Sequence, residues 1–577
     1  MKRLLFLALW TFAAVAAQAA GTGARPPNII LILADDQGYG DLGCHGHPCL
    51  KTPALDALHR ESVRLTNFHM DPTCAPTRAA LLTGKYATRV GVWHTLQGRS
   101  ILRREETTMA ELLRAGGYRT GIFGKWHLGD NYPYRPEDRG FQEVVIHGGA
   151  GVGQNPDYWG NTYFDDHYRR NGRWEKFDGY CTDVWFREAT RFIDRNQAAP
   201  FFCYVPLNAP HFWHRAPEKY VKPYLALGMD PDRALYFGMI ACIDENVGRL
   251  RERLAELGLQ DNTLLIYSSD NGPMPSKESP FSFNAGMRGA KGGPYENGHR
   301  LPCFLSWPAG GISGGRDVPQ LTAHFDLLPT LLELCGLPAP ARIAFDGRSL
   351  APLLRGPKPE WRERTLIVHN PRVERPQKWL RSAVMSERWR LVNGRELYDL
   401  RADPGQKHDV AATEADVVQR LRLEYEKWWD ALTPRFDESA ELSIGAPEEN
   451  PVKLTCHDWH SVRARELATW NPQVILDREQ DNGWWTLRVE RAGTYTFRLQ
   501  DLPDEAPGDK RLQAVRARLK IGGLDLQEAV GSGATSVMFT ATLPAGPARM
   551  DTWLIKDDGA MRGAPFVYVE WTGPEQR

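Results

Sequence analysis

A cysteine stands at the predicted start of a helix in the stretch PTCAPTRAALLTGKY, and its neighbours indicate a site for an anion. Pro76 lies where the first helical turn tolerates proline, and Gly84 can end the helix. Cys74 then lies at a helix N-terminus, where free backbone amides and the macrodipole favour a bound anion. A thiol is, however, an unusual nucleophile to direct at an oxyanion. Cys74 as half of a disulfide is possible, but a disulfide gives no reason for the Pro76 and Arg78 that follow.

Four apolar runs elsewhere in the chain are each followed by polar side chains. The runs cover 28–34, 120–124, 201–205 and 263–269, and after them come Asp35 and Asp36, Lys125 and His127, His211, and Asp270 and Asn271. Since the carboxyl ends of parallel strands line the ligand crevice of an open sheet, we expect these side chains to converge. Taken alone, each also fits a solvated turn, a surface position or a packed aromatic edge, and only the repeated placement favours a site.

The converging groups offer oxygen atoms to a metal ion. Asp35, Asp36, Asp270 and Asn271 are hard donors, which suit Ca²⁺ or Mg²⁺ better than zinc. Three carboxylates exceed the charge of a divalent cation by one. The basic groups Arg78, Lys125 and Lys291 would then make the pocket positive, so it is predicted to bind an anion.

A second group of metal-ligating residue types lies in one short loop. Cys44, His45, His47 and Cys49 suggest zinc by type, but ligands this close in sequence do not converge easily on one ion. Ordinary loop residues are the favoured interpretation.

The order of predicted elements indicates an α/β fold from about residue 26 to 335. Apolar strands such as NIILILA alternate with helices, and Tyr236 to Leu257 carries apolar residues at helical spacing before Gly258 ends it. This alternation predicts a mostly parallel central sheet flanked by helices. The predicted domain spans residues 21–335.

Two further units are expected after it. Residues 336–440 read as short strands around a turn followed by a helix, which predicts a small α+β subdomain. From 441 to 577 the pattern is β only: Trp485, Leu487 and Val489 alternate with polar residues, and similar strands follow. A C-terminal β-sandwich-like domain is predicted there.

Composition limits the class of protein. The 577 residues carry 71 basic and 71 acidic side chains, which argues against a nucleic-acid binder. Residues 1–20 combine a basic start, an apolar run and Ala17-Gln18-Ala19, as in a secretory signal peptide. No later segment is apolar for long enough to span a membrane, so we expect an exported, periplasmic or secreted protein. Nine cysteines leave at least one without an intrachain partner, and Cys74 is the candidate.

Five ordered motifs resemble those of the type I, formylglycine-dependent sulfatases of the alkaline phosphatase superfamily. CAPTRAALLTGKY resembles the Cys-x-Pro-x-Arg signature and GYRTGIFGKWHLG the second signature. LADDQGYGDLG and SSDNG resemble the metal-binding segments, and RGAKGGPYENGHRLP the late lysine segment. The resemblance covers roughly residues 26 to 437. Asn297 departs from the family pattern, which commonly has a second glycine after the acidic residue.

The resemblance implies that Cys74 is converted to formylglycine by a separate maturation enzyme that reads Cys-x-Pro-x-Arg. Pro76 and Arg78 then belong to its recognition motif. A hydrated aldehyde carries two hydroxyls on one carbon: one attacks sulfur and expels the alcohol, and the other, once deprotonated, lets sulfate leave. A serine would stop at a stable sulfate ester.

The resemblance also implies a role for each remaining site residue. The cation, Ca²⁺ or alternatively Mg²⁺, would be held by Asp35, Asp36, Asp270 and Asn271, with residue 74 itself as a further ligand. Arg78 and Lys125 would steady the hydrate, His127 would be the base for sulfate release, and His211 the acid for the leaving oxygen. Lys291 would bind a sulfate oxygen or share the acid role.

The alcohol half of the substrate is less determined. An exported enzyme with a β-sandwich tail suits sulfated polysaccharide or oligosaccharide fragments, and Trp93 and His94 after the cysteine helix are predicted to line the pocket. The segment NPDYWGNTYFDDHY is rich in aromatic residues. Its Tyr158 and Trp159 could stack on a sugar ring or pack in the protein interior, and the sequence allows both. Carbohydrate binding or core packing fits Trp484 and Trp485. Oligomeric state is not predicted.

Two alternatives remain open. A phosphonate or phosphate ester hydrolase of the same superfamily can share the cysteine motif, and pocket charge does not separate it from a sulfatase. A non-catalytic glycan-binding relative is the alternative from another class. The intact set of predicted catalytic residues counts against this second alternative.

Overall fold

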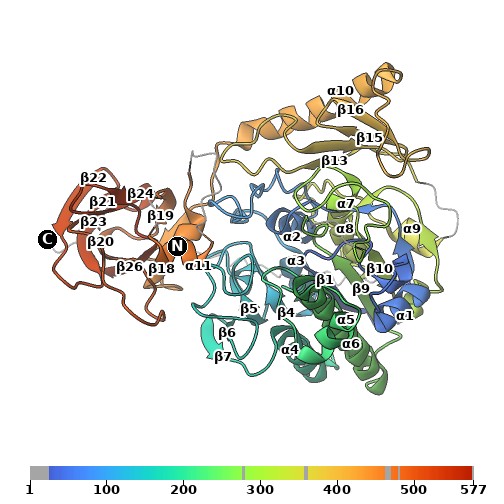
Figure 1. The fold of residues 1–577 in the computed structure, drawn as a ribbon, viewed down its shortest axis with the longest axis horizontal. Coiled ribbons are helices and arrows are strands. Elements are labelled where there is room, and N and C mark those ends of the chain that lie inside the picture. Colours follow the sequence, from blue (N-terminus) through green and yellow to red (C-terminus); the bar gives the residue numbers. More distant parts are fainter. Residues whose placement is uncertain (1–24, 276–279, 357–360, 462–469, 479–480, 575–577) are drawn as a thin grey trace, which may run out of the picture.

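The computed structural model describes residues 25–275, 280–356, 361–461, 470–478 and 481–574. Figure 1 shows a large α/β body, a smaller layer that carries α10, and a C-terminal body of strands at the left. The predicted signal peptide at residues 1–20 lies outside the described residues. The predicted boundaries near 335 and 440 stay predictions.

A ten-stranded sheet forms the centre of the α/β body. Strand β1 (Asn28–Ala34) lies between β8 (Phe201–Pro206) and β9 (Thr263–Ser269), parallel to both. On the far side of β8, β4 (Arg119–Lys125) and β5 (Glu143–His147) continue the parallel pairing. These five strands supply the predicted parallel core.

The outer strands run in mixed directions. Strand β10 (Cys303–Ser306) is antiparallel to β9, and β6 (His167–Arg170) and β7 (Arg173–Lys176) form a hairpin beyond β5. Strands β2 (Val63–Leu65) and β11 (Asp317–Val318) complete the opposite edge, and β3 (Phe68–His69) pairs with β12 (Thr322–Ala323) beside the sheet. The prediction of a mostly parallel sheet is confirmed.

Helices cover both faces of this sheet because alternate residues of β1 enter separate cores. Ile29 and Leu31 pack on the side of α2 (Cys74–Thr83), α3 (Met109–Ala115), α8 (Leu327–Leu334) and α9 (Ala351–Arg355). Ile30 and Ile32 pack on the side of α1 (Pro53–Glu61), α4 (Cys181–Asn196) and α6 (Pro231–Glu256), and α5 (Glu218–Leu225) lies against α6. Figure 1 shows these helices on either side of the strands.

Helix α6 begins earlier than its apolar spacing predicted. The carboxylate of Asp230 accepts the backbone N–H of Arg233, and Pro231 occupies the first turn. This N-cap starts the helix ahead of Tyr236, the first apolar residue of the predicted stripe. The one-turn helix α7 (Glu296–His299) follows the late lysine segment.

The small α+β unit contains four antiparallel strands and one helix. They are β13 (Leu366–His369), β14 (Ser382–Met385), β15 (Trp389–Val392), β16 (Glu396–Asp399) and α10 (Ala415–Leu432). Val384 and Leu391 of the sheet share a buried core with Leu421 and Tyr425 of the helix.

The C-terminal body consists of two mostly antiparallel sheets with a common core. One contains β17 (Leu442–Ile444), β19 (Trp484–Val489), β24 (Gly546–Ile555), β21 (Arg516–Ile521) and β22 (Leu524–Ala529), with β25 (Met561–Arg562) on β24. The other contains β18 (Val452–Thr455), β26 (Phe566–Gly573), β20 (Gly493–Gln500) and β23 (Val537–Leu543). Trp485 and Phe497 meet in this core, which supports the predicted sandwich.

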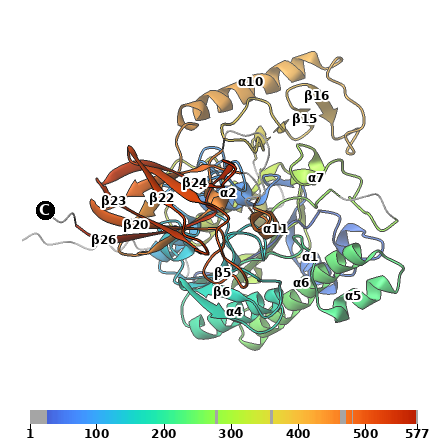
Figure 2. The ribbon, with the colours of Figure 1, turned by 60° about the vertical axis from the view of Figure 1, so that its left-hand side comes forward.

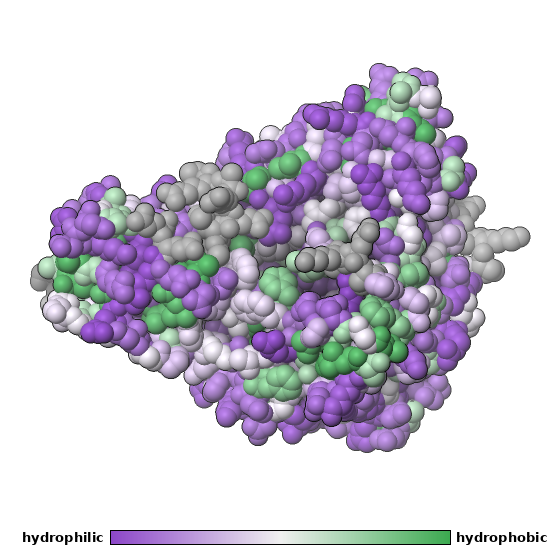
Figure 3. All heavy atoms as spheres, viewed as in Figure 1, coloured by the Kyte–Doolittle hydropathy of each residue, from purple (hydrophilic) through white to green (hydrophobic). Residues whose placement is uncertain are grey.

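The C-terminal body lies beside the α/β body. The short helix α11 (Pro472–Leu476) lies between the two in both ribbon views (Figures 1 and 2). Most of the surface in Figure 3 is hydrophilic, and apolar residues form separate groups on it. Within the described ranges, no helix is long and apolar enough to cross a membrane. The nine cysteines all lie in described residues, and none is in a disulfide.

Candidate active site

The register of the central strands brings two pairs of metal-ligating residue types together. Ala34 of β1 lies opposite Ser269 of β9, so the residues that follow both strands meet beyond the same sheet edge. The backbone N–H of Asp270 donates to Ala34 O (2.9 Å), and the N–H of Asp36 donates to Asp270 Oδ1 (3.3 Å). The convergence expected from strand polarity is therefore observed.

Cys74 is the first residue of α2 and points at this carboxylate group. Its side chain is 2% exposed, and Sγ lies 3.5 Å from Asp35 Oδ1. Gly84 ends the helix with φ of 68°, as its position predicted. Burial and the neighbouring Asp35 raise the pKa of the Cys74 thiol to about 12, so an unmodified thiol is protonated at neutral pH.

Two lysines each hold one of the paired aspartates. Lys125 at the end of β4 donates to Asp35 Oδ2 (2.6 Å), and Lys291 lies 2.6 Å from Asp36 Oδ1. Burial disfavours the charge on Lys291, but Asp36 outweighs that effect and raises the lysine pKa above its usual value. The site thus places two cationic groups beside Cys74.

The two aspartates differ in their surroundings. Burial and the nearby Asp270 raise the pKa of Asp35 to about 8. Burial also acts on Asp36, but Lys291 and His211 outweigh it and lower that pKa below its ordinary value. Like charges are therefore crowded around Asp35, while Asp36 is the better neutralised carboxylate.

The donor set fits a hard divalent cation. Asn271 donates through Nδ2 to Asp36 Oδ1 (2.7 Å) and to Gly272 O (3.0 Å). Its buried Oδ1 accepts no hydrogen bond from the part of the chain that the structure describes, so it is available as an oxygen ligand. One ligand atom each from Asp35, Asp36, Cys74 and His211 lie within 4.8 Å of one another. The sequence predicted His211 as a catalytic acid and not as a metal ligand.

Arg78 lies one helical turn after Cys74, is fully buried, and donates hydrogen bonds to other groups of the protein. Its guanidinium donates to Asp270 Oδ2 through Nε (3.2 Å) and Nη2 (2.8 Å). Nη1 donates to Lys125 O (3.0 Å), and Nη2 also donates to Leu207 O (3.3 Å). Arg78 therefore links α2 to three of the strand ends that form the site.

His127, two residues beyond β4, is held as a neutral ring. Its Nε2 lies 2.9 Å from Thr95 O, and because a carbonyl only accepts, this nitrogen carries the proton. Nδ1 is then unprotonated, and it is buried without a hydrogen-bond partner among the described residues. Burial and Lys125 hold the pKa of His127 well below its usual range.

His211 lies beside Asp36, the other of the paired aspartates. Nε2 is 3.8 Å from Asp36 Oδ2, and Nδ1 donates to Phe212 O (2.6 Å). The ring of Phe212 stacks on it with centroids 4.5 Å apart. Burial and Lys291 lower the pKa of His211 well below its ordinary value.

The two residues predicted to line the pocket are packed into its surroundings. Trp93 is buried, donates to Val373 O (3.0 Å) and has Arg99 over its ring at 4.7 Å. The Nδ1 of His94 accepts the backbone N–H groups of Thr95 (2.8 Å) and Leu96 (3.0 Å). These contacts favour structural roles, and substrate binding by Trp93 or His94 stays a prediction.

Asn370 connects the two motifs that carry Cys74 and Lys291, and the sequence did not indicate it. Thr73, the residue before Cys74, donates to Asn370 Oδ1 (3.0 Å), and Asn370 Nδ2 donates to Gly292 O (3.1 Å). The sequence offered one signal for Asn370, which is a polar residue directly after strand β13 of the small α+β unit.

The C-terminal body also reaches the site. The ring of His457 lies 6.1 Å from that of His127, and its carbonyl accepts the N–H of Gln97 (3.0 Å). Trp470 lies 5.9 Å from Phe212 between ring centroids. A dense CHDWH segment within a β-only tail was the available signal for His457.

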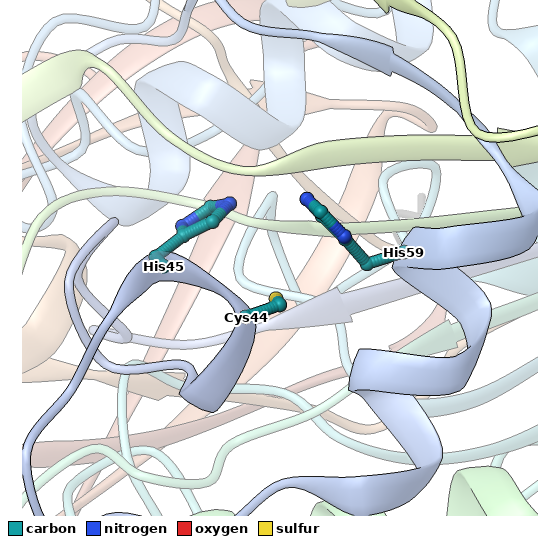
Figure 4. A group of neighbouring side chains, drawn as sticks. All are labelled: Cys44, His45 and His59. Atoms are coloured by element: carbon teal, nitrogen blue, oxygen red, sulfur yellow. The ribbon is translucent and has the colours of Figure 1, made fainter.

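The short loop that suggested zinc by residue type brings together a different set of residues from the four that the sequence suggested. Cys44, His45 and His59 converge, and the two imidazole rings point toward one another above the sulfur (Figure 4). His47 instead accepts the N–H of Leu50 through Nδ1 (2.9 Å).

Each converging group already has its own partner. His45 donates to Tyr39 O (2.6 Å), and His59 faces the Arg64 guanidinium at 3.5 Å. Burial and the neighbouring Asp56 raise the pKa of the Cys44 thiol. A cation beside His59 and a protonated thiol disfavour a metal ion, so we assign none to this loop.

Two family models match the chain. The sulfatase model covers residues 27–337, and a model of the C-terminal part of N-sulphoglucosamine sulphohydrolase covers 291–429. The first spans more than half of the chain and includes Cys74, Lys125, His211 and Lys291. The second covers the four strands of the small α+β unit and most of α10.

Curated relatives and solved structures agree. Human arylsulfatase A is 34% identical over 58% of this chain and 68% of its own, and canine N-acetylgalactosamine-6-sulfatase is 34% identical over 59% and 68%. The structure of Ps i-CgsB in complex with k-i-k-neocarrahexaose is 29% identical, with a TM-score of 0.63 over 71% of this chain and 95% of that chain. A phosphonate monoester hydrolase of Agrobacterium radiobacter, 23% identical with a TM-score of 0.51, shares the fold. The chain belongs to the sulfatase family and is a sulfuric ester hydrolase.

Proposed function

We propose that this enzyme hydrolyses sulfate monoesters of carbohydrates, with Cys74 converted to formylglycine and a bound Ca²⁺ ion. The observation that carries the proposal is the placement of Cys74 Sγ 3.5 Å from Asp35, with Lys125 and Lys291 on the paired aspartates. This arrangement puts residue 74 at a hard-cation site that two basic groups border, as an anionic ester requires.

Formylglycine at position 74 would supply two hydroxyls on one carbon, one to attack sulfur and one whose ionisation releases sulfate. The unmodified residue does not offer this, because a cysteine has a single sulfur on Cβ, and its thiol is protonated in this environment. Cys74 is the first residue of α2, so an anion bound at this position would lie near the free amides of the first helical turn. Pro76 and Arg78 complete the motif that a maturation enzyme would read.

The cation would be held by Asp35, Asp36, Asp270 and Asn271, where it would polarise sulfate oxygens and help ionise the nucleophile. The free Oδ1 of Asn271 supports this assignment. Mg²⁺ is the alternative ion, since both metals prefer oxygen donors. Arg78 orients Asp270 through two hydrogen bonds and so keeps that carboxylate in place.

Proton transfer falls to the two histidines. His127 has an unprotonated, buried Nδ1 and a tautomer fixed by Thr95, which are the properties of a base for sulfate release. His211 is the proposed acid for the leaving oxygen, which requires a proton on the Nε2 that faces Asp36. Lys291, which contacts the same carboxylate, would bind a sulfate oxygen or share the acid role.

The substrate class is inferred from relatives. Two relatives bear names that specify sulfated sugars: the canine N-acetylgalactosamine-6-sulfatase and Ps i-CgsB, solved with k-i-k-neocarrahexaose. We propose a sulfated polysaccharide or oligosaccharide fragment. The N-terminal segment supports export to the periplasm or medium, where such substrates occur.

The test is a paired assay on the full chain co-expressed with a formylglycine-generating enzyme. Aryl sulfate and aryl phosphate are compared first, and then defined sulfated saccharides. We expect turnover of the aryl sulfate and of at least one saccharide, with far lower turnover of the phosphate. A preference for the phosphate would contradict the proposal and favour the phosphonate or phosphate ester alternative.

A further inference from the structure

Three aromatic rings from two bodies of the molecule meet beside His211. Phe212 and Trp213 follow it in the loop after β8, and Trp470 comes from the C-terminal region. The ring centroid of Trp470 lies 5.9 Å from that of Phe212 and 6.2 Å from that of Trp213. This aromatic group therefore spans the junction between the α/β body and the C-terminal sheets.

The α/β body holds this junction in place through Asn155. Its backbone N–H donates to Trp470 O (2.8 Å), and its Nδ2 donates to Cys456 Sγ (3.2 Å). A single residue thus contacts both ends of the segment that carries His457 and Trp470. These contacts tie Trp470 and the sandwich-core residue Cys456 to the same residue of the α/β body.

The aromatic group lies where the alcohol half of the substrate leaves. Phe212 stacks on His211, the proposed acid for the leaving oxygen, so the group bonded to that oxygen must lie near these rings. Trp213 is 41% exposed, so part of its ring is open to a ligand. Aromatic faces with a few convergent polar groups are typical of ligand sites.

A polar group from the same segment lies near the proposed base. Asp458 Oδ1 is 3.0 Å from His457 Nδ1, which places the proton on that nitrogen and leaves Nε2 as an acceptor. Nε2 is buried and has no hydrogen-bond partner within the described ranges. The His457 ring is 6.1 Å from that of His127, so this free acceptor belongs to a ring next to the proposed base.

We propose that the C-terminal sheet domain completes the substrate site. Trp470, with Phe212 and Trp213, stacks on a pyranose ring of the departing saccharide. His457 Nε2 accepts a hydrogen bond from one hydroxyl of that saccharide. The inference rests on the proposed function and adds the part of the site that recognises the sugar. It gives the C-terminal domain a role in specificity, whereas the residues proposed to bind sulfate and cleave the bond all lie in the α/β body.

The experiment compares kcat/KM for two substrates in the wild type and in Trp470→Ala, Trp213→Ala and His457→Ala. The probes are an aryl sulfate, which has no sugar, and a sulfated saccharide that the wild type hydrolyses, with k-i-k-neocarrahexaose tried first. We expect the ratio of saccharide to aryl sulfate kcat/KM to fall roughly ten-fold or more in each variant. The matched control is Trp553→Ala on β24, where Arg518 lies 5.2 Å from the ring, and its ratio should equal the wild-type ratio.

The outcomes separate this inference from the proposed function. A wild type that hydrolyses neither probe contradicts the proposed function itself. Equal losses on both probes in all three variants would overturn the inference, because they would show a structural role for the junction. If Trp470→Ala does not fold, Trp213→Ala decides, since its partly exposed ring contributes less to packing. An unchanged ratio in Trp213→Ala and His457→Ala would also overturn it.

Discussion

Lys125 and Lys291 illustrate how this site balances charge at the level of single residues. Each ammonium lies 2.6 Å from one of two adjacent aspartates, and both lysines border the residue proposed to attack sulfur. Preorganised cations of this kind stabilise charge that develops in a transition state. Their removal should lower turnover, and because both ion pairs are buried it should lower stability as well.

The variant Lys125→Ala tests this directly. We expect kcat to fall by about 10²- to 10³-fold on an aryl sulfate, as for loss of one electrostatic contact to a transition state. The control is Lys219→Ala, whose largely exposed side chain pairs with Glu245, and its kcat should be unchanged. Steady-state kinetics with thermal melting measures both effects. A Lys125→Ala enzyme with full kcat would contradict the assignment.

His127 has a different expected signature because it is proposed to act only after the alcohol has left. In His127→Ala, one equivalent of alcohol per active site should appear in a burst, followed by turnover about 10²-fold or more below wild type. Stopped-flow measurement of aryl alcohol release resolves the two phases. A uniform slow release without a burst would show that His127 acts at the first step instead.

At the scale of elements, the site depends on strand ends and a helix start that are held from outside the sheet. Asn370 is the clearest case, since it accepts from Thr73 at the start of α2 and donates to Gly292 beside Lys291. One amide thereby sets the distance between two catalytic motifs that are far apart in sequence.

Replacing Asn370 by Asp keeps the acceptor for Thr73 and removes the donor to Gly292. We expect kcat/KM to fall about five- to twenty-fold, the equivalent of one or two hydrogen bonds of ordinary strength. Asn370→Ala, which loses both contacts, should fall further. Equal activity of wild type and both variants would show that the bridge does not position the site.

Backbone spacing between β4 and β8 is a second constraint at this scale. Gly124 has φ of 136°, and a Cβ at that position would lie 1.9 Å from Pro206 O. Gly124→Ala should therefore destabilise the fold by about 3 kcal/mol or more and displace the adjacent Lys125. Gly531→Ala is the control, because no atom lies within 4 Å of its added Cβ. Urea unfolding of both variants measures the difference, and equal midpoints would refute the steric argument.

At the scale of the whole molecule, local patterns predicted much of the fold and the central part of the site. Continuous apolar runs identified β1, β8 and β9, and strand polarity brought Asp35 and Asp270 together, because both signals are local in sequence. The sulfatase resemblance was likewise carried by short motifs, and the family match confirms it.

Contacts between units could not be predicted in the same way. His457 and Trp470 reach the site only because the C-terminal body packs on the α/β body, and no periodicity encodes that approach. The tail tryptophans show the same limit. Trp485 is fully buried in the sandwich core, so packing accounts for it. Trp484 is half-buried and stacks on His460, and carbohydrate binding by this residue stays a prediction.

The proposed cation should contribute to the stability of the whole chain. An ion that binds only the folded protein raises its melting temperature with concentration, so removal by EGTA should lower the melting temperature by a few degrees. Added Ca²⁺ should restore it. Asn271→Ala removes one oxygen ligand, the free amide Oδ1, from the proposed cation site. Its melting temperature should therefore rise less on addition of Ca²⁺. An identical response to Ca²⁺ in both proteins would contradict this ligand assignment.

The most direct test of the account is the chemical state of residue 74 measured together with turnover. The protein is prepared with different amounts of co-expressed maturation enzyme. For each preparation, mass spectrometry of the tryptic peptide that contains residue 74 gives the converted fraction, and steady-state kinetics on an aryl sulfate gives kcat. We predict an aldehyde in place of the thiol, activity proportional to the converted fraction, and none in a folded Cys74→Ala protein. Full turnover by a preparation in which residue 74 is entirely cysteine would contradict the account.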